Sequence, residues 1–273
     1  MPGEIEASKD ASRWTNMVAD YEALAEPLSR QYARAALAMV GGIGHGARVL
    51  DVAAGTGSLS LLAAEAGAQV VATDLSPGMV ARLAERLAGY PGCTARVMDG
   101  QALDVSDGAF DATFSIFGIC LFPDWRKGLR ELARSTCTGG HGCVAVWRDP
   151  EGAVQRVILV EAFSSIFPDG ALPPMPEGVL VLASLDALEA EMALAGFSNV
   201  TVRAVDGAWT GASVDALVTD AKRISRFVPS FAELERSDGD QLTSALREAL
   251  ERYVSGGVVS VPCTALVALG QRL

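Results

Sequence analysis

The stretch that decides the fold runs from Arg48 to Met79 and reads RVLDVAAGTGSLSLLAAEAGAQVVATDLSPGM. Two short apolar runs each end at an acid, Asp51 and Asp74, and a glycine-rich turn follows the first of them. Short apolar runs bounded by turn residues predict buried strands, and the apolar spacing between the two runs predicts a helix. A strand, a helix and a second strand together form the unit from which parallel sheets are built.

The same alternation continues along the chain. Further strands are predicted over 93–99, 110–117, 142–147, 199–205 and 260–270, and helices over 76–89, 124–136, 153–167, 185–195, 214–227 and 231–253. Two leading helices are predicted before Gly41, and Pro27 is expected to start the second of them. Strands that alternate with helices predict a doubly wound, Rossmann-like α/β fold.

Charge and cysteine usage limit the possible functions. The chain has 273 residues, a formal net charge of −11 and five scattered cysteines without a C-x-x-C pair. The net charge disfavours a nucleic-acid substrate, because the phosphate backbone repels an acidic surface. The cysteines indicate reduced thiols rather than a zinc site. Without an apolar run of about 20 residues or a signal-peptide pattern, we expect a cytoplasmic protein with no membrane span.

The glycine-rich turn predicts a site for an adenosine-bearing cofactor. Gly55 and Gly57 allow the backbone to approach a ligand closely, and the helix that follows contributes a positive dipole. Asp74 ends the next strand, where a carboxylate can accept both ribose hydroxyls. These features fit NAD as well as S-adenosylmethionine, because the dinucleotide fingerprint also places an acid about 20 residues after its glycines.

Three residues favour S-adenosylmethionine over NAD. Ser60 stands where the dinucleotide fingerprint has its third glycine or alanine, and Asp51 precedes the turn. A carboxylate there would repel a pyrophosphate, whereas it suits the ammonium and sulfonium groups of S-adenosylmethionine. Asp99 ends the third strand, where it can accept a hydrogen bond from the adenine amino group.

From VLDVAAGTG to GCVAVW, roughly Val49 to Trp147, the sequence resembles the class I S-adenosylmethionine-dependent methyltransferases. Within that family it is similar to the ubiquinone/menaquinone and natural-product methyltransferases. The resemblance implies a seven-stranded sheet whose last strand is antiparallel, and S-adenosylhomocysteine as the product left in the site. The cofactor-binding residues that we assign on this basis are Asp51, Ala53, Gly55, Gly57, Asp74, Leu75, Met79, Asp99, Gly100, Gln101 and Ile116.

The sequence departs from that family at two places. Ala53 replaces the first glycine of the D-x-G-x-G-x-G motif, a variant with which we expect cofactor binding to survive. After FGI the similar quinone methyltransferases have Arg-Asn, whereas this chain has Cys120 and Leu121. The second departure argues against the quinone-specific chemistry.

The acceptor is predicted to be a small, apolar or aromatic molecule. Candidate pocket residues are Tyr21, Phe117, Cys120, Phe122, Trp147, Arg148, Trp209 and Phe227, although for each of them core packing is an open alternative. His45 and His141 lie in turns away from the expected site. The catalytic residue is left unassigned, with Asp149 as a candidate base.

We therefore expect one methyltransferase domain that moves a methyl group to O, N or C of a small molecule of secondary metabolism. Its parts are N-terminal helices (1–42), a cofactor-binding core (43–150), the remaining core elements with a helical cap inserted before the last strand (151–257), and the last strand (258–273). Two alternatives stay open: an NAD-dependent oxidoreductase and a non-catalytic methyltransferase-like binding protein. No metal is expected, and the oligomeric state stays open.

Overall fold

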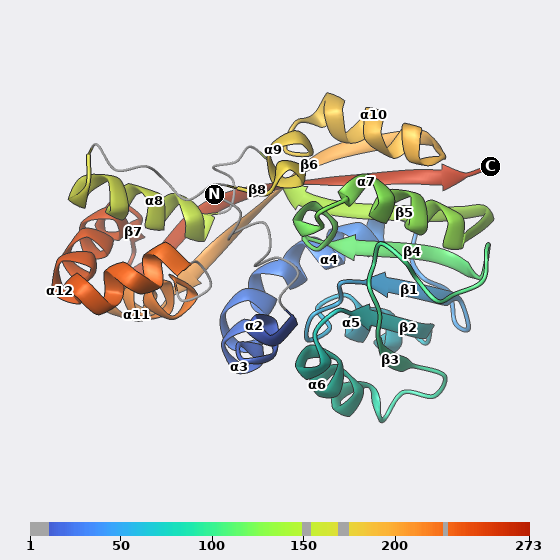
Figure 1. Ribbon diagram of the computed structural model, residues 1–273, viewed down its shortest axis with the longest axis horizontal. Helices are drawn as coiled ribbons and strands as arrows, with labels where there is room; N and C mark the ends of the chain where they lie inside the picture. The colour runs from blue at the N-terminus through green and yellow to red at the C-terminus, as the bar shows by residue number, and fades with distance from the viewer. Residues whose placement is uncertain (1–10, 149–153, 169–174, 226–228) are drawn as a thin grey trace. The chain divides into compact units, whose positions relative to one another are not determined.

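The computed structural model describes residues 11–148, 154–168, 175–225 and 229–273 (Figure 1). These residues group into two compact units. The first holds the chain up to Arg148 together with 176–205 and 265–273, and the second holds the described parts of 149–175 and 206–264.

A mostly parallel sheet organises the first unit (Figure 1). The strand order is β3-β2-β1-β4-β5-β8-β6, and β8 runs antiparallel to β5, with Cys143 opposite Leu269. The order reverses between β1 and β4, which is where doubly wound sheets bind their ligands. The predicted doubly wound fold class and the antiparallel last strand are confirmed, but the described sheet has eight strands rather than the predicted seven, because β7 (Val254–Ser255) pairs with β8. The strands are β1 Arg48–Val52, β2 Gln69–Asp74, β3 Thr94–Val97, β4 Phe110–Ile116, β5 Thr136–Trp147, β6 Phe197–Gly211 and β8 Val258–Arg272.

Local signals in the sequence set several helix ends. Ser76 caps α6 by accepting the Met79 N–H at 3.3 Å, and Asp124 caps α7 by accepting the Lys127 N–H at 2.9 Å. Gly196 ends α10 in the left-handed conformation, at φ 111°. The helices of this unit are α2 Ala11–Thr15, α3 Val18–Asp20, the π-helix η1 Tyr21–Ala25, α4 Glu26–Met39, α5 Ser60–Glu65, α6 Pro77–Leu87, the 3-10 turn η2 Ile119–Leu121, α7 Trp125–Ser135, α9 Glu177–Val181 and α10 Leu185–Ala195.

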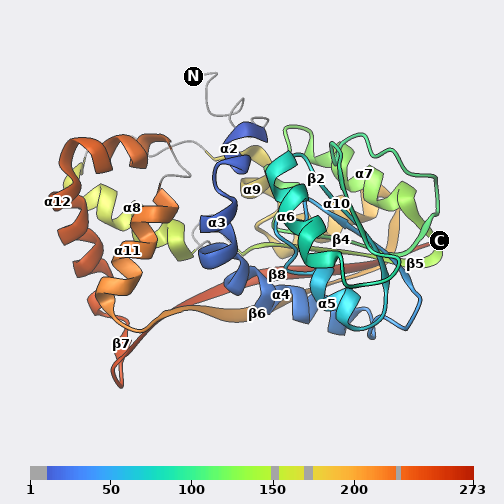
Figure 2. The ribbon, with the colours of Figure 1, turned by 90° about the horizontal axis from the view of Figure 1, so that it is seen from below.

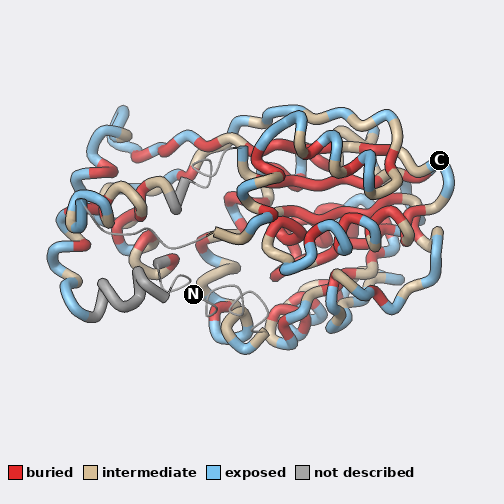
Figure 3. The backbone as a smooth tube through the Cα atoms, turned by 45° about the horizontal axis from the view of Figure 1, so that its top comes forward, coloured by how far each residue is buried: buried red, intermediate tan, exposed pale blue. Residues whose placement is uncertain are grey.

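The central strands β1 and β4 and the second half of β5 are buried on both faces, as their apolar residues predict, whereas the edge strands β3 and β6 are mostly exposed or half-buried (Figure 3). Along β5, Cys143 and Ala145 pack into one core with α4, α5 and α6, whereas Val144 and Val146 pack into another with α7 and α10. Alternate residues of a strand point to opposite faces, so one strand contributes to both cores. This packing fixes the strand ends that carry the site.

The second unit is mainly helical. It contains α8 Val154–Ile166, α11 Val214–Ser225, α12 Pro229–Glu251, the short strand β7 Val254–Ser255 and the adjoining parts of β6 and β8. The helices predicted over this part of the chain are present, whereas β7 was not predicted. Their role as a cap stays a prediction. Within the described ranges, no helix is long and apolar enough to cross a membrane.

Candidate functional site

The turn after β1 has the backbone of a ligand-binding loop. Gly55 and Gly57 both have positive φ, 55° and 109°, and a Cβ on Gly57 would lie 2.5 Å from the Leu83 side chain. Ala53 has φ 57°, a conformation that costs a non-glycine residue on the order of 1 kcal/mol. The loop therefore holds a strained, close-packed shape, as sites that admit a ligand close to the backbone often do.

Asp74 lies beside this loop at the end of β2. Its carboxylate accepts the Gly55 N–H and the Ser76 N–H, each at 2.9 Å. Burial raises the pKa of Asp74, and these N–H groups oppose that shift. A carboxylate has about four acceptor positions. The Leu75 N–H also interacts with this carboxylate, which leaves acceptor capacity for a ligand hydroxyl, and the predicted ribose contact stays a prediction.

Asp51 lies beneath the loop rather than at its surface. Its side chain is buried and accepts the Ser60 hydroxyl at 2.6 Å and the Ser60 N–H at 3.1 Å. Burial raises the pKa of Asp51 to about 7, and the charge of Asp74 adds to the rise. Asp51 thus tethers the start of α5 to β1, and its predicted contact with the methionine end of the cofactor stays a prediction.

The segment after β3 is tied to the start of α7. The Asp99 carboxylate accepts hydrogen bonds from the backbone N–H of Gln101 at 2.9 Å and from its side-chain amide nitrogen at 3.0 Å. The side-chain oxygen Oε1 of Gln101 in turn accepts the Asp124 N–H at 2.8 Å. Between Asp99 and Gln101, Gly100 packs so closely that a Cβ would lie 2.5 Å from the Phe122 ring. Asp99 itself is exposed. Its carboxylate is therefore positioned, and accessible, for the adenine amino group that we predicted.

Three other predicted cofactor residues differ in exposure. Met79 and Ile116 are 1% and 6% exposed, and Ile116 belongs to the core that packs against α4 to α6. Leu75, next to Asp74, is 37% exposed and open to a ligand. As packed, Met79 and Ile116 serve the core, and their contacts with the cofactor stay predictions.

An aromatic cluster lies at the carboxyl ends of β4 and β5. Phe117 and Trp147 stack with ring centroids 4.2 Å apart, and Tyr32 of α4 meets both rings edge-on at 5.3 and 5.4 Å. Phe117 has φ 60°, while its N–H donates to the Ala145 carbonyl at 2.8 Å. Phe117 and Trp147 are predicted pocket residues and are half-buried, whereas Tyr32, which has the helical spacing of a core residue, is fully buried behind them.

The cluster adjoins the glycine-rich turn at Gly118. A Cβ on Gly118 would lie 2.3 Å from the Cβ of Ala53, so the end of β4 and the end of β1 are in direct contact. The glycine-rich turn and the aromatic cluster therefore adjoin within the first unit, and their union in one site stays a prediction.

The remaining predicted pocket residues are dispersed. Cys120 is buried, its thiol points to the Phe117 carbonyl at 3.6 Å, and burial raises its pKa to about 12, so it stays a neutral thiol at pH 7. Phe122 covers Gly100, Arg148 is exposed after β5, and Trp209 is buried within the second unit. Asp149 and Phe227 lie outside the described residues.

Tyr21 lies against the cofactor loop, although sequence reasoning assigned it to the acceptor pocket. Its ring carbons come within 2.8 Å of where a Cβ on Gly55 would be. Burial raises the pKa of Tyr21 well above its ordinary value, and the charges of Asp74, Glu26 and Asp51 raise it further. Tyr21 therefore stays a neutral hydroxyl beside a cluster of acids, where it can donate a hydrogen bond.

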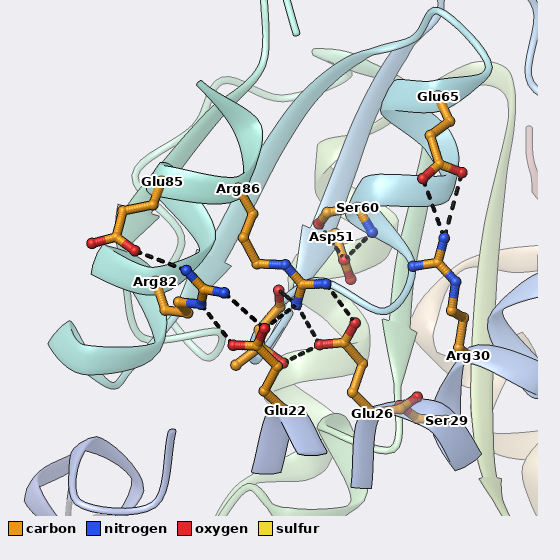
Figure 4. A network of polar contacts seen from close by, with 11 residues as sticks. Glu22, Glu26, Ser29, Arg30, Asp51, Ser60, Glu65, Arg82, Glu85 and Arg86 are labelled. Atoms are coloured by element: carbon orange, nitrogen blue, oxygen red, sulfur yellow. Dashed lines mark hydrogen bonds and ion pairs between the residues drawn. The ribbon is translucent and has the colours of Figure 1, made fainter. Parts of the chain in front are cut away.

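Sequence reasoning also missed a polar network beneath the loop (Figure 4). Glu22 and Glu26, on η1 and α4, form ion pairs with Arg82 and Arg86 of α6. The sequence did contain a signal for this network. Two acids lie four residues apart on one predicted helix and two arginines lie four residues apart on another, and residues with this spacing share a helix face.

The geometry agrees with known proteins. A family model described as a methyltransferase domain matches residues 49–140. A demethylmenaquinone methyltransferase of Thermus thermophilus is 37% identical over 164 residues, which cover 55% of this chain and 74% of that protein. Among solved structures, the YcgJ protein from Bacillus subtilis has a TM-score of 0.54 at 17% identity, over 88% of this chain and 98% of its own.

Another solved structure is phosphoethanolamine N-methyltransferase 2 of Haemonchus contortus in complex with S-adenosyl-L-methionine. Its TM-score is 0.55 at 22% identity, over 89% of this chain and 52% of its own. The structural matches show the fold, and the sequence match carries the family. With the strand order, the glycine-rich turn and the acid at the end of β2, they establish that this chain belongs to the class I S-adenosylmethionine-dependent methyltransferases, related to the quinone methyltransferases.

Proposed function

We propose that this methyltransferase acts on a small, apolar or aromatic acceptor that binds against Phe117 and Trp147, the two half-buried rings of the aromatic cluster, behind which Tyr32 is fully buried. The observation that carries the proposal is the position of this cluster. It adjoins the cofactor loop through the contact of Gly118 with Ala53, at the sheet edge where a substrate would meet the cofactor. Clustered aromatic side chains favour an apolar ligand surface.

Bound S-adenosylmethionine supplies a methyl group that its sulfonium has already activated. The chain's own task is then to bind and align the two reactants and to exclude water, which can supply roughly 7–11 kcal/mol of the barrier. In this proposal the Asp74 carboxylate binds the ribose hydroxyls, and the Gly55–Gly57 backbone receives the methionine end. The stacked rings of Phe117 and Trp147 align the acceptor.

The acidic groups near the loop fit a cationic donor. Asp51, Asp74 and Glu26 lie close enough to Tyr21 for their charges to raise its pKa. Such surroundings favour a sulfonium over the neutral sulfide of S-adenosylhomocysteine. They would therefore also help the product to leave after transfer. Cys120 takes no covalent part, because its thiol is buried and its pKa is about 12.

The name of the Thermus relative makes a reduced quinone one acceptor to test. The chain has Cys120 and Leu121 where the similar quinone methyltransferases have Arg-Asn, so it lacks the charge of that arginine and the amide of that asparagine. We therefore place other hydroxylated aromatic compounds ahead of demethylmenaquinol as candidate acceptors.

The experiment is a transfer assay with methyl-labelled S-adenosylmethionine against hydroxylated aromatics, a demethylmenaquinol analogue and small aliphatic amines. We expect label in at least one hydroxylated aromatic and a KM for it that rises about tenfold in Trp147→Ala, because loss of an aromatic contact costs about 1.4 kcal/mol. Label found only in the aliphatic amines would contradict the proposed acceptor class.

A further inference from the structure

The N-terminal segment, here η1 and the start of α4 (residues 21–26), follows two short helices that lie beside α6 (Figure 2). Two acids of this segment face two arginines of α6 (Figure 4). Glu22 and Glu26 are four residues apart, and so are Arg82 and Arg86. The Glu22–Arg82 pair is bidentate, at 2.6 and 2.8 Å, and the Glu26–Arg86 pair is bidentate, at 2.5 and 2.9 Å. The two pairs thus have the same chemistry, one helical turn apart.

Only the second pair reaches the cofactor loop. The Thr56 hydroxyl donates to the Glu26 carboxylate, and Arg86 donates to the Thr56 carbonyl at 2.8 Å. Thr56 lies between Gly55 and Gly57, so the loop is held at a side chain and at a peptide group. The Glu22–Arg82 pair has no hydrogen bond to the loop among the contacts of the described residues.

The second pair is also the more buried one. The side chains of Glu26 and Arg86 are 6% and 20% exposed, against 28% and 39% for Glu22 and Arg82. Buried ion pairs often contribute little net stability, because desolvation offsets their attraction, and apolar replacements are often tolerated. A buried pair that fixes a glycine loop is therefore better explained by the shape it imposes than by the stability it adds.

The same segment also carries a ring to the loop. Tyr21, five residues before Glu26, packs against Gly55. A shift of this segment would therefore move two groups at Gly55 together: the Tyr21 ring that packs against it and Thr56, the next residue in the loop. The network connects α6, the N-terminal segment and the loop at the expected methionine end of the cofactor.

We propose that Glu26 and Arg86 are positioning residues for the cofactor: their ion pair, closed through Thr56, holds the Gly55–Gly57 loop and Tyr21 in the shape that receives the methionine end. Neither residue is assigned a contact with the reacting atoms. The proposal rests on the cofactor of this family and does not depend on the identity of the acceptor.

The test compares Arg86→Met with the matched control Arg82→Met on the full chain. Binding of S-adenosylhomocysteine is measured by calorimetry, and folding by thermal unfolding. We expect Arg86→Met to weaken binding at least about tenfold, the equivalent of one charge-assisted hydrogen bond, and Arg82→Met to weaken it less than about threefold. Equal losses in the two variants would overturn the proposal.

A double variant, Arg86→Met with Glu26→Leu, separates positioning from stability. It leaves no buried unpaired carboxylate, so we expect its melting temperature to return to within about 5 °C of the wild type. Its affinity for S-adenosylhomocysteine is expected to stay at least about tenfold weaker. Recovery of affinity together with stability would mean that the pair is merely structural.

Arg86→Lys adds a graded step. Lysine keeps the charge but lacks the planar fork that binds Glu26 and the Thr56 carbonyl together, so we expect an affinity between those of the wild type and Arg86→Met. An affinity no better than that of Arg86→Met would contradict the role of the ion pair. If the wild type does not bind S-adenosylhomocysteine, the cofactor assignment itself is wrong. If the wild type binds it and the variants bind it equally well, only the positioning role of Glu26 and Arg86 is wrong.

Discussion

The two halves of the site are built in different ways. At the ends of β1, β2 and β3, backbone N–H groups, glycines and carboxylates form a polar surface, in which Asp74 and Asp99 each accept local N–H groups. At the ends of β4 and β5, the half-buried rings of Phe117 and Trp147 form the surface, and the fully buried ring of Tyr32 packs behind them. One half depends on backbone shape, and the other depends on which side chains stand there.

The difference explains why one fold serves many acceptors. A glycine loop and an acid at a strand end recognise the common part of the reaction, the cofactor. A ring cluster can change its outline by substitution at a few positions without disturbing that loop. The predictions that follow test whether the two halves can be impaired separately.

The largest effect is expected from Asp74→Ala. The substitution removes the acceptor of the Gly55 and Ser76 N–H groups and the proposed ribose ligand together. At about 1.5–3 kcal/mol for each hydrogen bond to a charged group, we expect the affinity for S-adenosylmethionine to fall about 100-fold or more. Calorimetric titration measures it, with Asp99→Ala as a comparison that removes the proposed adenine contact and the acceptor of the two Gln101 hydrogen bonds. An affinity within threefold of the wild type would contradict the assigned role.

Gly118→Ala tests the point where the halves touch. The new Cβ would lie 2.3 Å from the Cβ of Ala53, and overpacking of this kind costs about 1–3 kcal/mol. We expect a lower free energy of unfolding in urea and weaker cofactor binding.

Adding Ala53→Gly to Gly118→Ala removes the atom with which the new Cβ clashes. It also removes the strain of a non-glycine residue at a φ of 57°. We therefore expect Ala53→Gly to be near neutral alone and to restore most of the stability lost in Gly118→Ala. Additive effects of the two substitutions would show that the contact is not the cause.

An intermediate effect is expected in the acceptor half. Phe117→Leu and Trp147→Ala remove the stacked pair, whose centroids are 4.2 Å apart. We expect each to raise the acceptor KM about tenfold while the Kd for S-adenosylmethionine stays within about twofold, because neither ring is part of the cofactor surface. A loss of cofactor affinity equal to the loss for the acceptor would mean that the two halves are not separable.

The smallest effect concerns pH. Burial raises the pKa of Asp51 from 3.8 to about 7, so the folded chain holds this proton at pH values where the unfolded chain has released it. The stability that Asp51 contributes is therefore fully present below about pH 3.8 and is lost as the pH rises through about 7. Urea unfolding at pH 5 and pH 8 measures it, and we expect a smaller difference in Asp51→Asn than in the wild type. An unchanged difference would assign the pH dependence to other groups.

The ionised form of Asp51 should also favour the cationic donor. We expect the ratio of the affinities for S-adenosylmethionine and S-adenosylhomocysteine to rise a few-fold between pH 6 and pH 8, and to change less in Asp51→Asn. The ratio cancels the titration of the amino group and carboxylate that both ligands share. The carboxylates of Asp74 and Glu26 and the neutral hydroxyl of Tyr21 lie in the same region and are kept in the variant.

Much of the fold could be predicted because its determinants are local. The cap residues Ser76 and Asp124 and the stop at Gly196 each act within a few residues of their own helix. Strand lengths were harder, because β5 and β6 run longer than their apolar segments. Hydrogen bonds to a neighbouring strand extend these strands, and the sequence of one strand alone does not show that pairing.

The candidate site shows the same division. The glycine turn and the acids Asp51, Asp74 and Asp99 can be identified from the sequence, because they lie at the ends of predicted strands. The Glu26–Arg86 pair joins residues 60 apart, and Tyr32 meets Trp147 across a still longer separation. Such contacts depend on tertiary packing, so sequence reasoning assigned Tyr21 to the acceptor and did not find the network at all.

Calorimetric titration of S-adenosylhomocysteine into the wild type, Asp74→Ala and Trp147→Ala, with NADH as a second ligand, compares the two halves in one experiment. We expect the wild type and Trp147→Ala to bind S-adenosylhomocysteine with affinities within about twofold of each other, Asp74→Ala to bind it about 100-fold more weakly, and NADH not to bind. Binding of NADH alone, or a loss in Trp147→Ala as large as that in Asp74→Ala, would contradict both the cofactor assignment and the separation of the two halves.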